Sequence, residues 1–211
     1  MNLIAPDTFD KKEREIKDLM FKTSEEIEGE ESKEGKDFLT LDSENLSQIV
    51  MTLFRKAQVE RDYGKMYAQL CQNLIQEELH KIGEQKVTKK TIAKSVFRKT
   101  LLQSCRASFD KLFMSEEEFN AKEDEEQLKL KDKLMNNIKF IAYLFKFNLI
   151  QEGTILSIFK DLFEGRDEKK EPVSDRAIEG AIVLINKIGV EADRQIASCA
   201  EGIKKAEEAI K

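Results

Sequence analysis

Apolar residues recur along this chain at intervals of three and four positions, which is the spacing of one face of an α-helix. The pattern is clear over residues 46–57, 63–74, 93–112, 134–149, 155–162, 178–188 and 196–210. No segment of useful length alternates between apolar and polar residues, so strands are not expected. The chain is therefore predicted to be all-α.

The predicted helices follow one another in pairs. They start near residues 42 and 62, 91 and 131, then 151, 173 and 190, which gives a degenerate repeat of about 40 residues. This spacing predicts a HEAT-type solenoid of stacked antiparallel helical hairpins, because each hairpin buries its inward stripe against its neighbours. We expect one such domain over residues 1–211. A globular helical bundle is the alternative.

Two longer stretches interrupt the apolar pattern, at about residues 22–40 and 114–130. Both are rich in Glu, Lys and Ser and offer little to bury, so we expect mobile loops or frayed helix ends there. Within the second stretch, Ser115 followed by Glu118 fits a capping box, which predicts that a helix starts at that point.

The composition supports a helical, intracellular protein. Of the 211 residues, 40% are apolar and 36% are charged, with only two prolines and no tryptophan. The three cysteines lie within apolar helical patterns without paired spacing, which is typical of reduced, buried thiols. No apolar run approaches the length of a membrane span, and the N-terminus lacks a secretion signal. We expect a soluble cytoplasmic monomer that is not associated with a membrane.

Residues suited to catalysis or metal binding are scarce. The single histidine, His80, is expected to be a solvated helical residue, since no second histidine or cysteine cluster could complete a zinc site. The acidic run over residues 116–126 is most simply a solvated loop. We therefore expect no enzymatic activity, no cofactor and no metal.

One segment carries a marked excess of positive charge. Between Gln85 and Phe109 there are seven Lys or Arg residues and no acidic residue, although the net charge of the chain is −5. Lys90, Lys94 and Arg98 are spaced to line one ridge of the third predicted helix. Such a ridge could bind RNA phosphates or an acidic protein, and the alternative is a solvated face with no ligand.

Three blocks of residues occur in the order and with the spacing of a known family. They are Phe54-Arg55-Lys56-Ala57 with Tyr67-Ala68-Gln69-Leu70-Cys71, then Phe97-Arg98-Lys99 with Leu101, Leu102, Cys105 and Phe109, then Asn137-Ile138-Lys139-Phe140-Ile141 with Leu144-Phe145-Lys146. Together they resemble the repeats of the middle domain of eukaryotic translation initiation factor 4 gamma. The resemblance covers roughly residues 2 to 190.

The two ends of the chain depart from that family. The opening segment, residues 2–9, is similar to the family's Leu-Thr-Pro-x-x-Phe start, but Ala5 stands where a threonine would cap the first helix. The family domain has five hairpins, and the pattern here indicates about four. We therefore expect the domain to be truncated at its C-terminal end.

The resemblance implies a scaffold that binds a DEAD-box RNA helicase of the initiation factor 4A type, binds RNA, and stimulates the helicase ATP cycle. Phe140 is expected off the inward stripe formed by Ile138, Ile141 and Phe145, and thus free to contact a partner. By matched position, the expected helicase-binding residues are Leu3, Pro6, Phe9, Asn137, Lys139 and Phe140. The expected RNA-binding residues are Lys90, Lys94, Arg98 and Lys99.

Two alternatives accompany these expectations. The helicase-binding candidates could serve only the packing of hairpins. The chain could also be an RNA-binding or mRNA-metabolism adaptor of the same fold, similar to the poly(A)-binding-protein interactor or the nonsense-mediated decay scaffold.

Overall fold

The computed structural model of the protein describes residues 7–21, 43–88, 90–112, 114–164 and 174–189. These residues form helices and contain no strand, as the apolar spacing predicted. In order, the helices are α1 (Phe9–Met20), α2 (Ser43–Val59), α3 (Gly64–Lys81), α4 (Val96–Leu112), α5 (Glu116–Asn120), α6 (Asp124–Lys146), α7 (Glu152–Glu164) and a helix over residues 175–189. Two short 3₁₀ turns, Arg61–Tyr63 and Ile92–Lys94, precede α3 and α4.

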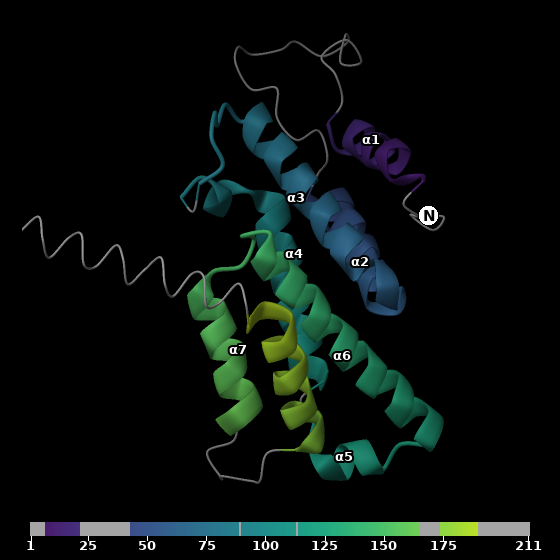
Figure 1. Ribbon diagram of the computed structural model, residues 1–211. Helices are drawn as coiled ribbons and strands as arrows, with labels where there is room; N and C mark the ends of the chain where they lie inside the picture. The colour runs from purple at the N-terminus through teal and green to yellow at the C-terminus, as the bar shows by residue number, and fades with distance from the viewer. Residues whose placement is uncertain (1–6, 22–42, 89, 113, 165–173, 190–211) are drawn as a thin grey trace, which may run out of the picture.

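The helices stack as hairpins in chain order (Figure 1). The first hairpin is α2 with α3, the second is α4 with α6, and the third is α7 with the helix over 175–189. The helix α1 packs on α3, where the Asn73 amide donates to Glu13 at 2.7 Å and Lys17 pairs with Glu77 at 3.5 Å. The prediction of an all-α solenoid of stacked hairpins is confirmed.

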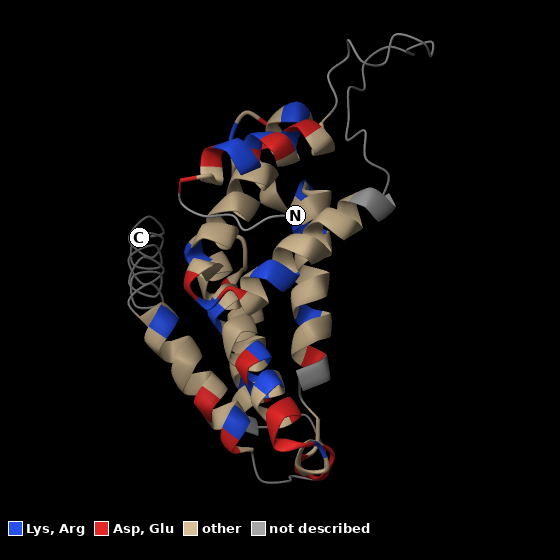
Figure 2. Cartoon of the chain, turned by 90° about the vertical axis from the view of Figure 1, so that its right-hand side faces the viewer, with Lys and Arg blue, Asp and Glu red and all other residues tan. Residues whose placement is uncertain are grey.

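The stretch over residues 114–130, expected to form mobile loops or frayed helix ends, contains more helix than expected. It contains the short helix α5 and the first turns of α6. The capping prediction explains why, because the Ser115 hydroxyl accepts a 3.2 Å hydrogen bond from the Glu118 amide at the start of α5. The acidic residues of this stretch are exposed and lie at the lower end of the molecule in Figure 2. The other predicted loop, 22–40, lies outside the described residues.

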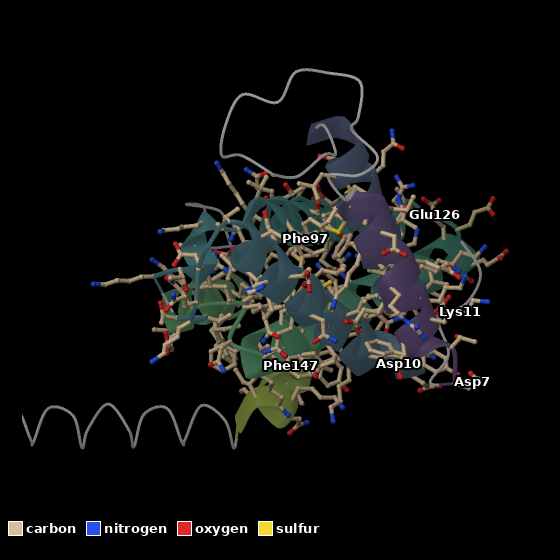
Figure 3. All side chains as sticks on the ribbon, turned by 90° about the horizontal axis from the view of Figure 1, so that it is seen from above. Asp7, Asp10, Lys11, Phe97, Glu126 and Phe147 are labelled. Atoms are coloured by element: carbon tan, nitrogen blue, oxygen red, sulfur yellow. The ribbon has the colours of Figure 1, made fainter. Side chains whose placement is uncertain are left out.

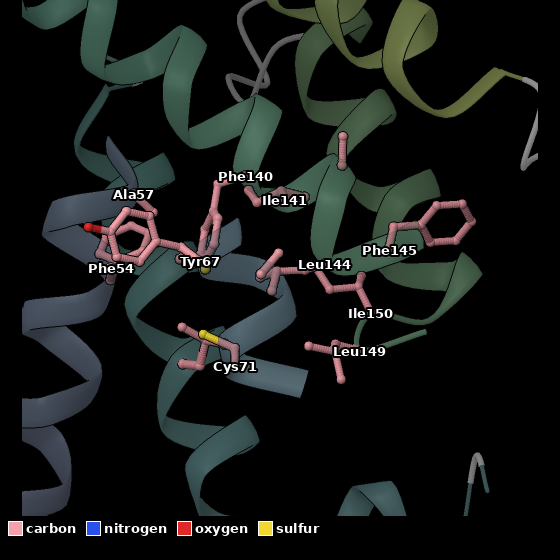
Figure 4. Close-up of a cluster of buried hydrophobic side chains, with 14 of the residues drawn as sticks. Phe54, Ala57, Tyr67, Cys71, Phe140, Ile141, Leu144, Phe145, Leu149 and Ile150 are labelled. Carbon is pink, nitrogen blue, oxygen red and sulfur yellow. The ribbon is translucent and has the colours of Figure 1, made fainter. Parts of the chain in front are cut away.

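The centre of the core lies where α2, α3 and α6 meet (Figure 4). Phe54 and Phe140 pack with tilted rings whose centroids are 6.1 Å apart, beside the fully buried ring of Tyr67. Cys71 is also fully buried, and burial raises the pKa of its thiol to about 12. It is therefore a reduced, inert core residue at neutral pH, as the sequence predicted.

The two long inner helices end in the same way. After α3, Gly83 adopts φ +84°, and the Glu84 amide donates to the Leu79 carbonyl at 2.9 Å. After α6, Asn148 adopts φ +59°, and the Leu149 amide donates to the Leu144 carbonyl at 2.9 Å. Both are Schellman caps, in which a left-handed residue turns the chain sharply away from the helix. The chain segments that follow both caps line the same hollow next to α3.

The start of α4 depends on a side chain from the preceding helix. The buried Glu78 carboxylate on α3 accepts a 2.8 Å hydrogen bond from the Val96 amide and a further bond from the Ser95 hydroxyl. The Ser95 oxygen in turn accepts from the Arg98 amide at 2.9 Å, as an N-cap residue does. Because Ser95 is extended, the third predicted helix begins at Val96 and not near residue 91.

The third hairpin sits closely against the second. A Cβ atom placed on Gly180 would lie 2.6 Å from Ile138 Cδ1 on α6 and 3.3 Å from Leu162 Cδ2 on α7. Nearby, Arg176 donates to Glu116 at 2.6 Å and stacks 3.8 Å above the Phe119 ring, which fastens α5 to the third hairpin. None of the helices in the described ranges is long and apolar enough to cross a membrane.

Candidate protein and RNA interface

A surface formed by α3 and the segments next to it contains two hollows that share Phe147 as a lining residue. The first, here the Phe9 hollow, has a volume of about 510 Å³ and is lined by Phe9, Asp10, Asp62, Tyr63, Lys65, Met66, Gln69 and Phe147. The second, here the Val87 hollow, measures about 340 Å³ and is lined by Gln72, Ile75, Gln76, Val87, Thr88, Ile92, Phe147, Asn148 and Leu149. Figure 3 shows Asp10 and Phe147 on the same side of the molecule.

The Phe9 hollow combines an apolar floor with charges at its edge. Phe9, at the first residue of α1, is partly buried against the core together with Tyr63 and Met66. Asp62 and Lys65 are exposed beside them. An apolar centre within a charged rim is the arrangement of protein-binding surfaces. The expectation that Phe9 contacts a protein partner remains a prediction, and Leu3 and Pro6 lie outside the described residues.

The block around Phe140 lies in the interior, which corrects the expectation for Phe140 and Asn137. The Phe140 side chain is fully buried against Phe54, so it is part of the inward stripe and does not lie beside it. Asn137 is also fully buried, and its amide donates to the Cys105 carbonyl on α4 at 3.4 Å. Both residues therefore hold α6 against its neighbours. Lys139 is partly exposed, and its role remains a prediction.

The Val87 hollow owes its shape to the two Schellman caps. The cap of α6 brings Phe147, Asn148 and Leu149 to the hollow, and the segment after the cap of α3 supplies Val87 and Thr88. The Gln72 amide donates to the Phe147 carbonyl at 3.0 Å, which fixes the cap of α6 to α3. The lining of the hollow contains no carboxylate.

The predicted cationic ridge is not a continuous ridge. Lys90 lies in a turn, Lys94 in the 3₁₀ turn and Arg98 in α4, because the extended Ser95 separates the turn from the helix. Lys94 pairs with Glu84, which precedes the acid-free stretch by one residue. The geometric basis of the ridge prediction was therefore wrong.

Two other cations of the stretch are also engaged. The Arg98 Nε donates to the Leu149 carbonyl at 2.7 Å and holds the loop after α6 against α4. Arg106 pairs with Asp110 at 2.9 Å and with Asp161 at 3.1 Å. Lys86, Lys90 and Lys99 are exposed and form no ion pair with any described residue. Within the described part of the chain, these three lysines are the cations of the segment that no other residue engages.

Sequence reasoning missed the residues that shape the hollows. Phe147 follows the apolar stripe of α6 and resembles one more core position, and Val87 stands alone among polar residues. A usable signal was the left-handed preference of Gly83 and Asn148, since such residues at helix ends mark sharp turns. No group of His, Cys, Asp and Glu suited to a metal ion is found within the described residues.

These features define an all-helical repeat protein whose stacked hairpins carry two hollows next to α3. The sequence profile of the MIF4G domain matches residues 15–206, and the chain belongs to this family. The prediction from the three residue blocks is thereby confirmed at the level of the family.

Individual relatives share low identity with the chain. It is 27% identical over 155 residues to a von Willebrand factor A domain-containing protein of Dictyostelium discoideum, covering 72% of this chain and 7% of that protein. It is 27% identical over 157 residues to eukaryotic initiation factor 4F subunit p150 of Saccharomyces cerevisiae, covering 69% and 16%. It is 24% identical over 212 residues to eukaryotic translation initiation factor 4 gamma 1 of Mus musculus, covering 92% and 11%. The chain thus spans less than a fifth of the length of each of these three.

Proposed function

We propose that this chain is a cytoplasmic translation-initiation scaffold domain that binds a DEAD-box RNA helicase of the initiation factor 4A type and RNA, and thereby stimulates the helicase ATP cycle. The observation that carries the proposal is the membership in the MIF4G family together with relatives named as initiation factors. A scaffold can do this only by binding the productive arrangement of the helicase lobes more tightly than other arrangements. A stiff stack of hairpins suits that task.

The Phe9 hollow supports the proposal as the contact surface for one helicase lobe. It contains Phe9, which the resemblance assigned to the helicase surface, and surrounds it with apolar and charged side chains from α3. A few buried aromatic anchors commonly supply most of the free energy of a protein interface. We therefore assign the main helicase contact to Phe9 and its neighbours Tyr63 and Met66.

Two residues of α1 provide a matched test. Phe9→Ala should weaken helicase binding by at least about tenfold, because it removes an aromatic anchor. Leu19→Ala is the control, since Leu19 is an apolar residue of the same helix with 63% exposure and lies outside the hollow. Binding is measured by titration with the purified helicase, and ATP hydrolysis is measured in the same mixtures. Absence of any complex with the unaltered chain, or equal effects of the two substitutions, would refute the proposal.

The second candidate function is an RNA-binding adaptor that needs no helicase. Exposed Lys86, Lys90 and Lys99 favour it, because their charges are not neutralised within the described part of the chain. Reversing all three to Glu should abolish RNA binding and spare helicase binding. If the unaltered chain binds RNA but neither binds nor stimulates the helicase, the adaptor function is the correct one.

A further inference from the structure

We propose that the Val87 hollow binds one nucleobase of a single-stranded RNA, a proposal that rests on the RNA contact of the proposed function. At about 340 Å³ the hollow lies at the low end of the roughly 300–1,000 Å³ that small-molecule sites occupy. It is therefore sized for a small planar group and not for a folded element of a protein partner.

The lining matches the chemistry of a nucleobase. Val87 supplies an exposed apolar side chain, the buried Ile75 and Leu149 complete the apolar lining, and Phe147 is an aromatic residue on which a base can stack. The amides of Gln76 and Asn148 stand at the same hollow and can both donate and accept hydrogen bonds, as the edge of a base requires. Apolar faces and polar edges are the two surfaces that a base presents.

The hollow is held in shape by bonds that a ligand would not need to form. The Schellman cap of α6 fixes Asn148, and the Arg98 guanidinium fixes the Leu149 carbonyl at 2.7 Å. In the segment that contributes Val87 and Thr88, the Thr88 amide donates to the Thr91 hydroxyl at 2.8 Å. A site that is formed in advance loses little conformational entropy on binding, so small contacts can contribute to affinity.

Charge distinguishes this hollow from its neighbour. The Phe9 hollow includes Asp10 and Asp62, which would repel a phosphate chain, whereas no carboxylate lines the Val87 hollow. Lys86 is exposed next to Val87 in the chain, and Lys90 is exposed two residues beyond Thr88. A strand whose base enters the hollow would therefore carry its phosphates past these two lysines. Bases of a duplex are stacked and paired, so only a single strand can offer one.

The test compares two oligonucleotides that carry the same phosphates. One is a fluorescent single-stranded RNA of mixed sequence, and the other is an abasic oligonucleotide of the same length. Phe147→Leu keeps an apolar side chain and removes the aromatic face, so affinity for the RNA should fall by at least about fivefold. Gln76→Ala should reduce it by about two- to fivefold. Neither substitution should change binding of the abasic strand.

Two further variants complete the design. Gln103→Ala is the matched control for Gln76→Ala, because Gln103 is an exposed glutamine that lines a different hollow, between α2 and α4, and it should change nothing. Replacing Lys86 and Lys90 with Ala should reduce the salt dependence of binding by about one to two counterions for both oligonucleotides alike. Thermal melting of each variant checks that the fold is retained.

The outcomes separate this proposal from the function on which it rests. If the unaltered chain binds neither oligonucleotide, the RNA contact itself is refuted. If it binds both equally and Phe147→Leu has no effect, RNA binding stands and the base site is refuted. Tighter binding of the RNA than of the abasic strand, lost selectively in Phe147→Leu and Gln76→Ala, is the expected result.

Discussion

The segment over residues 137–140 and the segment over residues 86–99 both suggested a binding site, but they differ in the structure. Asn137 and Phe140 are buried where α6 meets its neighbours, whereas Lys86, Lys90 and Lys99 face solvent. The buried segment belongs to one of the three blocks that resemble the family. Residues that match a family block can therefore serve the packing between repeats as well as the contact with a partner. The burial of their side chains distinguishes these two roles.

The largest effect is expected for Phe140→Ala, which should lower the free energy of unfolding by about 3–5 kcal/mol. The substitution leaves a cavity beside Phe54 and Tyr67 that the closely packed helices cannot fill. The free energy of unfolding is measured by urea denaturation followed by circular dichroism. Lys139→Ala is the control and should cost under about 0.5 kcal/mol. A Phe140→Ala variant as stable as the control would show that the block does not serve packing.

An intermediate effect is expected for Glu78→Ala, at about 1–3 kcal/mol in the free energy of unfolding. The Val96 and Phe97 amides and the Ser95 hydroxyl would lose their acceptor in a buried place. The variant Glu78→Gln keeps an acceptor oxygen and should cost less. Thermal melting compares the two variants with the unaltered protein. If Glu78→Ala melts like the unaltered protein, the start of α4 does not depend on α3.

The burial of Glu78 also predicts that the stability of the protein depends on pH. Burial raises the pKa of the Glu78 carboxyl above its ordinary value of 4.5, although the hydrogen bonds from Ser95, Val96 and Phe97 lower it in part. The folded state thus binds this proton more tightly than the unfolded state, so the contribution to stability is complete below pH 4.5 and is lost as pH rises through the folded pKa. The stability advantage of the unaltered protein over Glu78→Gln should therefore shrink as pH increases from about 4. If the difference in stability between the unaltered protein and Glu78→Gln does not change with pH, the raised pKa of Glu78 is contradicted.

The smallest effects are expected in the exposed segment. Lys99→Ala should change the free energy of unfolding by less than about 0.5 kcal/mol. Lys94→Ala removes a surface pair with Glu84 and should cost no more than about 1 kcal/mol. Thermal melting at two salt concentrations distinguishes them, because only the Lys94 effect should shrink as salt is added. A large loss of stability in Lys99→Ala would show that the Lys99 side chain contributes to packing.

Much of the fold could be predicted from the spacing of apolar residues, because helices of a solenoid each bury a single stripe. The helix near residues 46–57 was placed correctly for this reason, and α2 begins at Ser43. One error arose where a contact between residues far apart in the sequence determines where a helix begins. Ser95 interrupts the third helix because the buried Glu78 carboxylate binds its hydroxyl. The error at α5 has a local cause, because the Ser115 cap starts a helix where acidic residues suggested a loop.

The candidate site was less predictable. Phe140 belongs to a stripe wider than the one counted, since α6 is surrounded by α2, α3 and α4. Neither hollow could be expected from local pattern, because each is lined by residues that are far apart in the sequence, such as Gln76 and Asn148. Ion pairs between neighbouring segments, such as Lys94 with Glu84, likewise reduced the charge that a count of lysines had suggested.

The carboxylate of Glu78 also bears on where this protein can be divided. Repeat proteins are often handled as interchangeable modules that are cut between hairpins. Here the first turn of α4 obtains its acceptor from α3, so a cut between the first two hairpins leaves the start of α4 without the carboxylate that accepts from its amides. The smallest unit that can be excised or exchanged with its ends intact therefore contains α3 and α4 together.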